Sequence, residues 1–152
     1  RIPAVSIGTD IIVGFPGETD VEFNETLEFV QSIPFAGGHV FSYSAREGTG
    51  AARMPDQIHG NIKRQRSGIL RNVMAELAHN YQMRFLGKTV QVLWESSRKM
   101  DKSYLLSGHS PNYLRVDALS IQPMRNQYSL VKIDKINEKS CEGTLSTQVM
   151  RE

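Results

Sequence analysis

The order of apolar and polar residues divides the chain into a first part in which strand and helix alternate and a last part of short strands only. A continuous apolar run within 4–13 is typical of a parallel strand that is covered on both faces. The helical spacing of apolar residues over 20–31 predicts an amphipathic helix, and a second strand follows at 39–43. Because parallel strands need a crossover, these segments predict a right-handed β-α-β unit.

A longer helix and a small barrel are predicted for the rest of the chain. Apolar residues recur at helical spacing from Ile62 to Phe85. Either Asp56 or Asn61 can cap the start of this helix, and Gly87 is a natural stop. Five strand-like runs follow, at 89–94, 104–108, 113–116, 128–136 and 143–149. Their alternation predicts a five-stranded, OB-like antiparallel barrel, so the expected fold class is α/β followed by all-β.

The turn that follows the first strand is the first candidate for a binding site. Gly14 and Gly17 allow the backbone to approach a ligand or to adopt positive φ, and Pro16 between them fixes φ. Thr19 and Glu22 have the spacing of a capping box, which starts the next helix. Ligands of α/β folds bind beyond the carboxyl ends of the strands. The segment lacks the lysine of a phosphate-binding P-loop, and ordinary turn chemistry remains the alternative to a site.

Composition narrows the class of protein further. Hydrophobic residues make up 39% of the 152 residues, and neither a membrane-spanning apolar run nor a signal-peptide pattern is present, which predicts a cytoplasmic protein. Cys141 is the only cysteine, so neither an internal disulfide nor an all-cysteine cluster site can form from this chain alone. Residues 86–152 carry 10 basic and 7 acidic side chains, and this small positive excess permits nucleic-acid binding without requiring it.

Two stretches of the sequence resemble one enzyme family. The segment 9–19, which reads TDIIVGFPGET, and the segment 41–57, which contains FSYSAREGTGAA and then MPDQ, are similar to motifs of the radical S-adenosylmethionine methylthiotransferases. These enzymes add a methylthio group to a tRNA adenosine beside the anticodon or, in one branch, to a ribosomal protein. The resemblance is strong over 8–86, and the remainder is similar to the family's small RNA-binding barrel, called TRAM.

The resemblance implies that the chain is a C-terminal fragment with three parts. Residues 1–52 would be the last two βα steps of a partial (β/α)6 barrel, residues 53–87 a connecting helix, and residues 88–152 the TRAM barrel. In the family, a three-cysteine motif earlier in the barrel holds a [4Fe–4S] cluster, and an N-terminal domain holds a second cluster. Neither cluster is expected in this chain, which alone is expected to lack radical chemistry.

The resemblance also assigns residues to the binding of S-adenosylmethionine. The turn and the ends of both strands would form the mouth of the barrel, near the adenine and ribose of the cofactor. The residues are Asp10, Gly14, Phe15, Pro16, Gly17, Glu18, Ser42, Ser44 and Arg46. Asp10, expected to be buried, would orient the cofactor or bind neighbouring backbone. Arg46 would pair with the methionine carboxylate or an RNA phosphate, and an intrachain salt bridge is the alternative.

The predicted barrel carries the candidate RNA-binding residues, because OB-like barrels hold nucleic acid with exposed aromatic rings and with Lys and Arg. The candidates are Arg98, Lys99, Lys102, Tyr104, Asn112, Tyr113, Arg115 and Lys132. The segment 108–116 resembles the G-x-T/S-x-NYLRV signature of the branch that acts on N6-threonylcarbamoyladenosine in tRNA. Asn112 and Tyr113 would contact the anticodon stem-loop, and a turn cap and a core aromatic are their structural alternatives.

A basic cluster on the long helix has two open interpretations. Its members are Lys63, Arg64, Arg66 and Arg71. They would either contact tRNA phosphates or form a solvated charged face.

The predicted function is therefore that of part of a tRNA methylthiotransferase, which converts threonylcarbamoyladenosine next to the anticodon to its 2-methylthio form. The implied cofactors of the whole enzyme are S-adenosylmethionine and two [4Fe–4S] clusters, and its implied partners are the tRNA anticodon stem-loop and an electron donor. No membrane partner is expected, and the oligomeric state is open. Three alternatives remain: action on isopentenyladenosine in tRNA, action on a ribosomal protein, and, for the chain alone, an RNA-binding module without activity.

Overall fold

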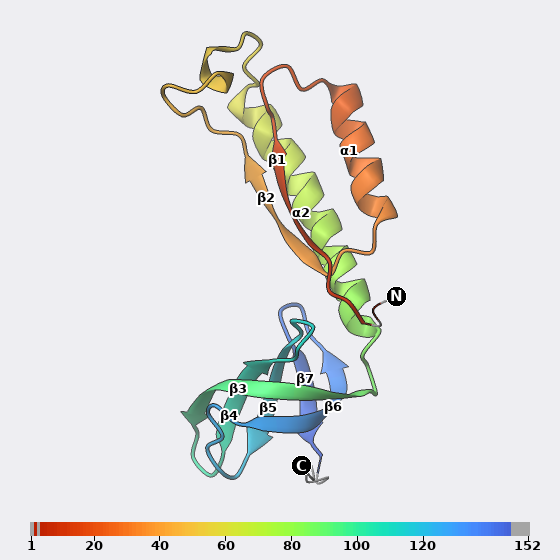
Figure 1. Cartoon of the computed structure of the whole chain (residues 1–152), viewed down its shortest axis with the longest axis vertical. Coiled ribbons are helices and arrows are strands. Elements are labelled where there is room, and N and C mark those ends of the chain that lie inside the picture. Colours follow the sequence, from red (N-terminus) through yellow and green to blue (C-terminus); the bar gives the residue numbers. More distant parts are fainter. Residues whose placement is uncertain (1, 3, 147–152) are drawn as a thin grey trace. The chain divides into compact units, whose positions relative to one another are not determined.

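The computed structural model describes residue 2 and residues 4–146, which divide into two compact units (Figure 1). The α/β unit comprises residues 7–78, and the barrel unit comprises the described residues before 7 and after 78. The elements of the first part are β1 (Gly8–Val13), α1 (Asp20–Ser32), β2 (Gly37–Ser42), the 3-10 helix η1 (Ala51–Arg53) and α2 (Gly60–Met83). The strands of the barrel are β3 (Thr89–Lys99), β4 (Tyr104–His109), β5 (Arg115–Ser120), β6 (Tyr128–Ile136) and β7 (Cys141–Leu145). The predicted fold class, α/β followed by all-β, is confirmed.

The α/β unit is built on two parallel strands that are covered on one face only. β1 and β2 pair in parallel along their whole length. The apolar core that joins them to α1 and α2 contains Val13, Phe23, Val30, Phe35, Val40, Leu70 and Met74. On the opposite face Ile12 remains 59% exposed and Phe41 50% exposed. The prediction of a first strand covered on both faces is therefore wrong for the part of the chain that the structure describes, because both helices pack on the same core.

Helix α1 begins at the predicted capping box. The Thr19 hydroxyl accepts a hydrogen bond from the Glu22 N–H at 3.2 Å, and the Glu22 carboxylate accepts one from the Thr19 N–H at 2.8 Å. The hydrogen bond from the Thr19 N–H, together with a second one from the Thr19 hydroxyl, holds the pKa of the Glu22 carboxyl below its ordinary value. The box fixes Asp20 as the first helical residue, where sequence analysis placed it.

Backbone conformation, rather than side-chain pattern, sets two other element boundaries. β1 begins at Gly8 and not at Ala4, whose φ of 59° is incompatible with an extended strand. α2 begins at Gly60, so neither predicted cap is correct. Asp56 precedes the helix with a φ of 58°, and Asn61 already lies inside it. Positive φ at a residue other than glycine leaves no clear signal in a single sequence.

The five barrel strands close on themselves. Their order is β3-β4-β5-β7-β6, and β3 also pairs with β6. All pairs are antiparallel except β5 with β7, so the barrel is mixed, whereas the sequence predicted a purely antiparallel one. The third strand begins at Arg115 and not at Tyr113, because Tyr113 lies in the preceding turn. The last strand begins at Cys141, and positions 147–149 of its predicted range lie outside the described residues.

The interior of the barrel is a mainly apolar core around one indole ring. Trp94 is fully buried, and its Nε1–H donates to the Ser129 Oγ at 3.0 Å, which satisfies the only polar atom of the indole. The fully buried aliphatic residues of the barrel unit include Val92, Leu106, Leu114, Val116, Val131 and Ile133. Gly108 lies opposite Trp94 across β3 and β4, where any Cβ would overlap the Leu93 carbonyl oxygen.

The close strand contact at Gly108 gives the first prediction. Gly108→Ala should lower the free energy of unfolding of the barrel by about 2 kcal/mol, because the added methyl group forces β3 and β4 apart. Urea unfolding followed by Trp94 fluorescence measures this change. Gly50→Ala is the control, since Gly50 has helical dihedrals and no atom near an added Cβ. Equal stability of the two variants would contradict the packing argument.

Candidate cofactor and nucleic-acid sites

The carboxyl ends of β1 and β2 lie side by side and open into a hollow of about 590 Å³. Four of the predicted cofactor-binding residues line it, namely Phe15, Ser42, Ser44 and Arg46. Its other lining residues are Ile12, Phe41, Tyr43, Thr49 and Ala51. The rings of Phe15 and Tyr43 meet edge to face with their centroids 5.3 Å apart. The hollow therefore combines an aromatic wall with the hydroxyl-bearing side chains of Ser42, Ser44 and Thr49 and one guanidinium.

The turn from Gly14 to Glu18 is closed by its own hydrogen bonds. Gly14 and Gly17 have φ values of 72° and 85°, the positive values that the sequence predicted as one option. The Gly14 N–H donates to the Glu18 Oε2 at 2.7 Å, and the Glu18 N–H donates to the Phe15 carbonyl at 2.9 Å. The Gly17 N–H donates to the Asp56 carbonyl at 3.0 Å. These N–H groups and the Glu18 carboxylate thus maintain the turn itself, which presents Phe15 to the hollow.

A buried arginine from α2 anchors this turn. The Arg66 Nη1 donates to the Glu18 Oε2 at 2.5 Å and to the Glu18 carbonyl at 2.9 Å, while Nη2 donates to the Asp20 Oδ1 at 2.6 Å. Only 6% of the Arg66 side chain is exposed. Burial disfavours its charge, but the hydrogen bonds from Arg66 to Asp20 and Glu18 outweigh burial and hold the pKa of Arg66 above its ordinary value. Arg66 is therefore neither a phosphate contact nor part of a solvated face, the two roles predicted for its cluster.

Two further members of the basic cluster also bond within the unit. The Lys63 Nζ donates to the Tyr43 carbonyl at 3.0 Å, and Arg71 donates to the Val40 carbonyl at 3.4 Å. The Arg64 guanidinium, in contrast, bonds only its helix neighbour Asn61 among the described residues. The cluster thus connects α2 to the ends of β1 and β2.

Asp10 within β1 and Arg46 after β2 differ in their surroundings. Asp10 is exposed, contrary to the expected burial, and its Oδ1 lies 3.0 Å from the His39 Nδ1 on the uncovered face of the sheet. The Arg46 guanidinium forms no ion pair with any residue that the structure describes, so the intrachain salt bridge considered above is not formed there. Arg46 is thus available to an anion at the wall of the hollow.

The predicted RNA-binding residues of the barrel occupy several environments. Arg98, Arg115 and Lys132 stand on its outer face, because their strand neighbours point inward. Tyr104 shares the strand face of the fully buried Leu106 and is only partly exposed. The remaining two basic candidates lie where β3 ends, Lys99 opposite Tyr104 and Lys102 in the turn to β4.

Asn112 and Tyr113 are adjacent in sequence but differ in their environment. The Asn112 Nδ2 donates to the Tyr81 hydroxyl at 2.9 Å, so Asn112 is bonded within the barrel unit. Tyr113 has a φ of 62° and is 82% exposed, which excludes the core role considered for it. Sequence analysis missed Tyr128 and His109, which share the outer face. The period-two alternation with buried Val131 and Gly108 could have identified both.

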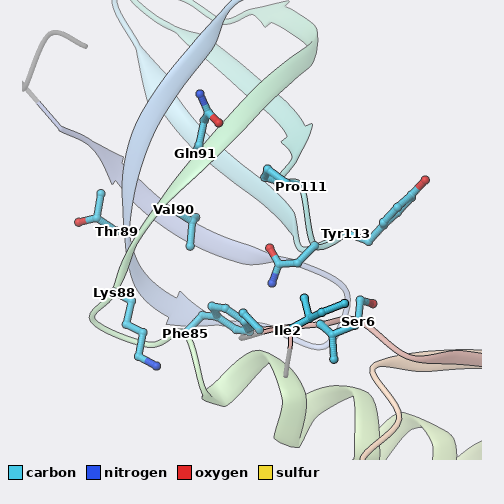
Figure 2. A pocket seen from close by; sticks show the side chains of 12 residues that line it. Ile2, Ser6, Phe85, Lys88, Thr89, Val90, Gln91, Pro111 and Tyr113 are labelled. Atoms are coloured by element: carbon cyan, nitrogen blue, oxygen red, sulfur yellow. The ribbon is translucent and has the colours of Figure 1, made fainter. Parts of the chain in front are cut away.

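A second hollow, of about 700 Å³, lies within the barrel unit (Figure 2). It is lined by residues before the α/β unit, by Phe85 and Lys88, by the start of β3 and by residues 111–113. Figure 2 shows the Tyr113 ring pointing away from this hollow, while Phe85 and Val90 line its interior. Its lining is mainly apolar, and sequence analysis did not predict it.

Sequence comparison gives these sites a family context. The chain is 34% identical over 143 residues to the threonylcarbamoyladenosine tRNA methylthiotransferase MtaB of Bacillus subtilis (strain 168), which covers 93% of this chain and 32% of that protein. It is 40% identical over 114 residues to the tRNA-2-methylthio-N(6)-dimethylallyladenosine synthase of Alkaliphilus oremlandii, and this match covers 75% of the chain and 24% of that protein. It is 34% identical over 151 residues to the ribosomal protein uS12 methylthiotransferase RimO of Desulforamulus reducens, and this match covers 96% of the chain and 34% of that protein.

The chain is homologous to the C-terminal region of the radical S-adenosylmethionine methylthiotransferases. It spans only about a quarter to a third of the length of the curated relatives it matches. No family model matches it. Because relatives with three different named substrates reach similar identity, the homology to methylthiotransferases does not distinguish the substrate branches.

The cysteine of the barrel unit is buried, and its thiol is free. Burial, with a contribution from Asp117, raises the pKa of the fully buried Cys141 thiol to about 11. Within residues 4–146, no three side chains of the His, Cys, Asp and Glu types are grouped to hold a metal ion. No helix of these residues is long and apolar enough to span a membrane.

The Arg66 anchor gives a prediction for the turn that forms one wall of the hollow. Arg66→Met should lower the free energy of unfolding by about 3 kcal/mol, because it leaves the buried Glu18 carboxylate without its cation. Urea unfolding monitored by far-UV circular dichroism measures the loss. Arg64→Met is the matched control on the same helix, and we expect little change there. A similar loss in both variants would show that helix propensity, not the ion pair, is responsible.

Cys141 gives a prediction about alkaline pH. The pKa of Cys141 in the folded protein, about 11, exceeds the ordinary value of 9.0. The protonated buried thiol therefore contributes its full share of the free energy of unfolding below pH 9. As pH rises from 9 towards 11, the Cys141 thiol ionises in the unfolded chain before it ionises in the folded protein. The free energy of unfolding should therefore fall by about 2 kcal/mol. Urea titrations at a series of pH values measure this slope. Cys141→Val should flatten it, and an unchanged slope in that variant would assign the effect to other groups.

Proposed function

We propose that this chain supplies the S-adenosylmethionine mouth and the RNA-holding barrel of a tRNA methylthiotransferase that acts on threonylcarbamoyladenosine beside the anticodon. One observation carries the cofactor part of the proposal. The hollow at the carboxyl ends of β1 and β2 offers an aromatic wall, hydroxyl groups and an arginine without an intrachain anion among the described residues. This is the position where α/β folds bind their ligands.

The residues of the hollow fit the chemical groups of S-adenosylmethionine. The Phe15 and Tyr43 rings offer apolar surface to an adenine, and the hydroxyls of Ser42 and Ser44 can hydrogen-bond the ribose or the amino group. The Arg46 guanidinium can bind the carboxylate in bidentate fashion. When bound there, S-adenosylmethionine supplies the methyl group and the hydrogen abstraction that methylthiolation requires. The other predicted residues, Asp10, Gly14, Pro16, Gly17 and Glu18, would shape and orient this mouth.

Cluster chemistry would come from other parts of the enzyme. The single cysteine of this chain is fully buried, so it does not fit the ligand set of a [4Fe–4S] cluster. The proposed role of this chain is therefore to hold the cofactor and the RNA, while cluster ligation and contact with an electron donor fall to the rest of the protein.

The substrate branch rests on the barrel. The Asn-Tyr-Leu-Arg-Val sequence at 112–116 resembles the signature of the threonylcarbamoyladenosine branch, and its Tyr113 is 82% exposed. The basic residues proposed to contact tRNA phosphates are Arg98, Lys99, Lys102, Arg115 and Lys132. We assign Tyr113 to an RNA base and Asn112 to the support of the loop, and Tyr104 remains a candidate at the barrel end.

Nucleoside analysis tests the proposed reaction and the branch together. Deletion of the gene that encodes this sequence should remove 2-methylthio-threonylcarbamoyladenosine from bulk tRNA while threonylcarbamoyladenosine persists. Mass spectrometry of digested tRNA measures both nucleosides. Complementation with the wild-type gene should restore the modified form, and complementation with Arg46→Gln should restore less, because the carboxylate of the cofactor loses its partner.

Two other results would contradict parts of the proposal. Loss of 2-methylthio-isopentenyladenosine instead would keep the enzyme class but overturn the branch. Unchanged tRNA with a loss of methylthiolation on a ribosomal protein would overturn the RNA substrate altogether.

A further inference from the structure

An unbroken row of side chains crosses four strands on the outer face of the barrel. Tyr128 of β6 lies opposite Leu93 of β3, Leu93 lies opposite His109 of β4, and His109 lies opposite Arg115 of β5. Directly opposed residues of antiparallel strands point to the same side, with Cβ atoms about 5 Å apart. The Tyr113 ring continues the row, since its centroid is 6.4 Å from that of His109.

The two tyrosines of this row are displayed rather than packed. Tyr128 is 57% exposed and Tyr113 is 82% exposed. Tyr113 also adopts a left-handed backbone conformation, with φ at 62°, that disfavours residues with a large side chain. Because its ring contributes almost nothing to the core, packing does not account for this strained conformation.

A hydrogen-bond network holds the Tyr113 loop in place. The Ser110 hydroxyl donates to the Asn112 Oδ1 at 2.7 Å and accepts from the Leu114 N–H at 3.1 Å. The Asn112 Nδ2 donates to the hydroxyl of the buried Tyr81 at 2.9 Å, and that hydroxyl donates to the Ala4 carbonyl at 2.9 Å. Tyr81 and Asn112 are therefore positioning residues that fix where the Tyr113 ring lies.

We infer that this row, from Tyr128 through His109 and Arg115 to Tyr113, is a stacking surface for unpaired RNA bases. The inference rests on the proposed function and specifies which part of an RNA the barrel would bind. Exposed rings interleaved with a cation are what single-stranded nucleic acid requires, since bases stack on rings and phosphates bind guanidinium groups. Paired bases in a helix are already stacked and cannot use such rings. OB-like barrels also bind through their second and third strands, which are β4 and β5 here.

The row carries one cation that a phosphate can bind. Arg115 is exposed and forms no ion pair with the residues that the structure describes. The carboxylate of Glu95 lies 2.9 Å from the His109 Nδ1, so this nearby acid orients the imidazole. Asp117, on the outer face of β5, accepts a hydrogen bond from the Ser107 hydroxyl.

Equilibrium binding to the 152-residue chain tests the inference. The probes are a fluorescein-labelled single-stranded oligoadenylate, the matching oligouridylate and a blunt-ended RNA duplex, measured by fluorescence anisotropy. Tyr113→Ala and Tyr128→Ala should each weaken single-strand binding about tenfold. Tyr113→Phe and Tyr128→Phe keep the rings and should bind within about twofold of wild type. Leu119→Ala, an exposed residue of β5 outside the row, is the matched control and should not change binding.

Two more variants distinguish the effect of the Tyr113 ring position on RNA binding from its effect on the stability of the fold. Tyr113→Gly relieves the left-handed conformation, so its Tm should equal or exceed that of wild type while single-strand affinity falls as in Tyr113→Ala. Asn112→Ala keeps every ring but releases the loop, and it should also weaken binding. A lower Tm for Tyr113→Gly with unchanged affinity would assign Tyr113 a structural role and overturn the inference.

The remaining outcomes distinguish this inference from the proposed function. If wild-type chain fails to bind the single strands at millimolar RNA, or if the Ala variants bind them as wild type does, the stacking surface is wrong. Restoration of methylthiolated tRNA in the deletion strain by those same variants would leave the proposed function intact. Ring-dependent binding of single strands in a protein whose deletion leaves tRNA nucleosides unchanged would support the surface and overturn only the proposed reaction.

Discussion

The α/β unit depends on one buried guanidinium. Arg66 binds Glu18 and Asp20, which lie 48 and 46 residues earlier in the chain, and so fixes the turn, the start of α1 and the side of α2 in one interaction. Without this cation the largely buried Glu18 carboxylate would keep, among the described residues, only the Gly14 N–H as a partner. Phe15 reaches the hollow because the same turn displays it. The geometry of the candidate cofactor mouth is thus set by an ion pair that does not line it.

The uncovered face of the β1–β2 sheet contributes Ile12 and Phe41 to the lining of the hollow. Parallel sheets are normally covered on both faces, yet Ile12 and Phe41 stand side by side on a face without a helix. Additional strands or a bound ligand would remove this apolar surface from water. Relatives about three times as long have the chain length to supply such strands.

The features that sequence analysis predicted correctly are those that local patterns encode. The capping box at Thr19, the glycines of the turn and the strand at 128–136 each follow from residues within a few positions. The long helix shows the limit of such patterns. Ile69 belongs to its predicted apolar spacing yet is 37% exposed, whereas the polar Arg66 and Ser67 are buried. Arg66 is buried because its partners lie on another element, and no periodicity within the helix contains that information.

Asn112 and Tyr113 show why a short signature can combine two physical roles. The asparagine side chain forms hydrogen bonds with Tyr81 and Ser110, so it contributes to the stability of the loop. The tyrosine is held in solvent at a positive φ, a conformation that persists only when surrounding contacts over-determine it. The stability that Asn112 supplies therefore compensates for the strain that Tyr113 introduces. Such an arrangement is expected where an exposed ring must be fixed before a ligand binds. A ring that is already ordered loses less conformational entropy when a base stacks on it.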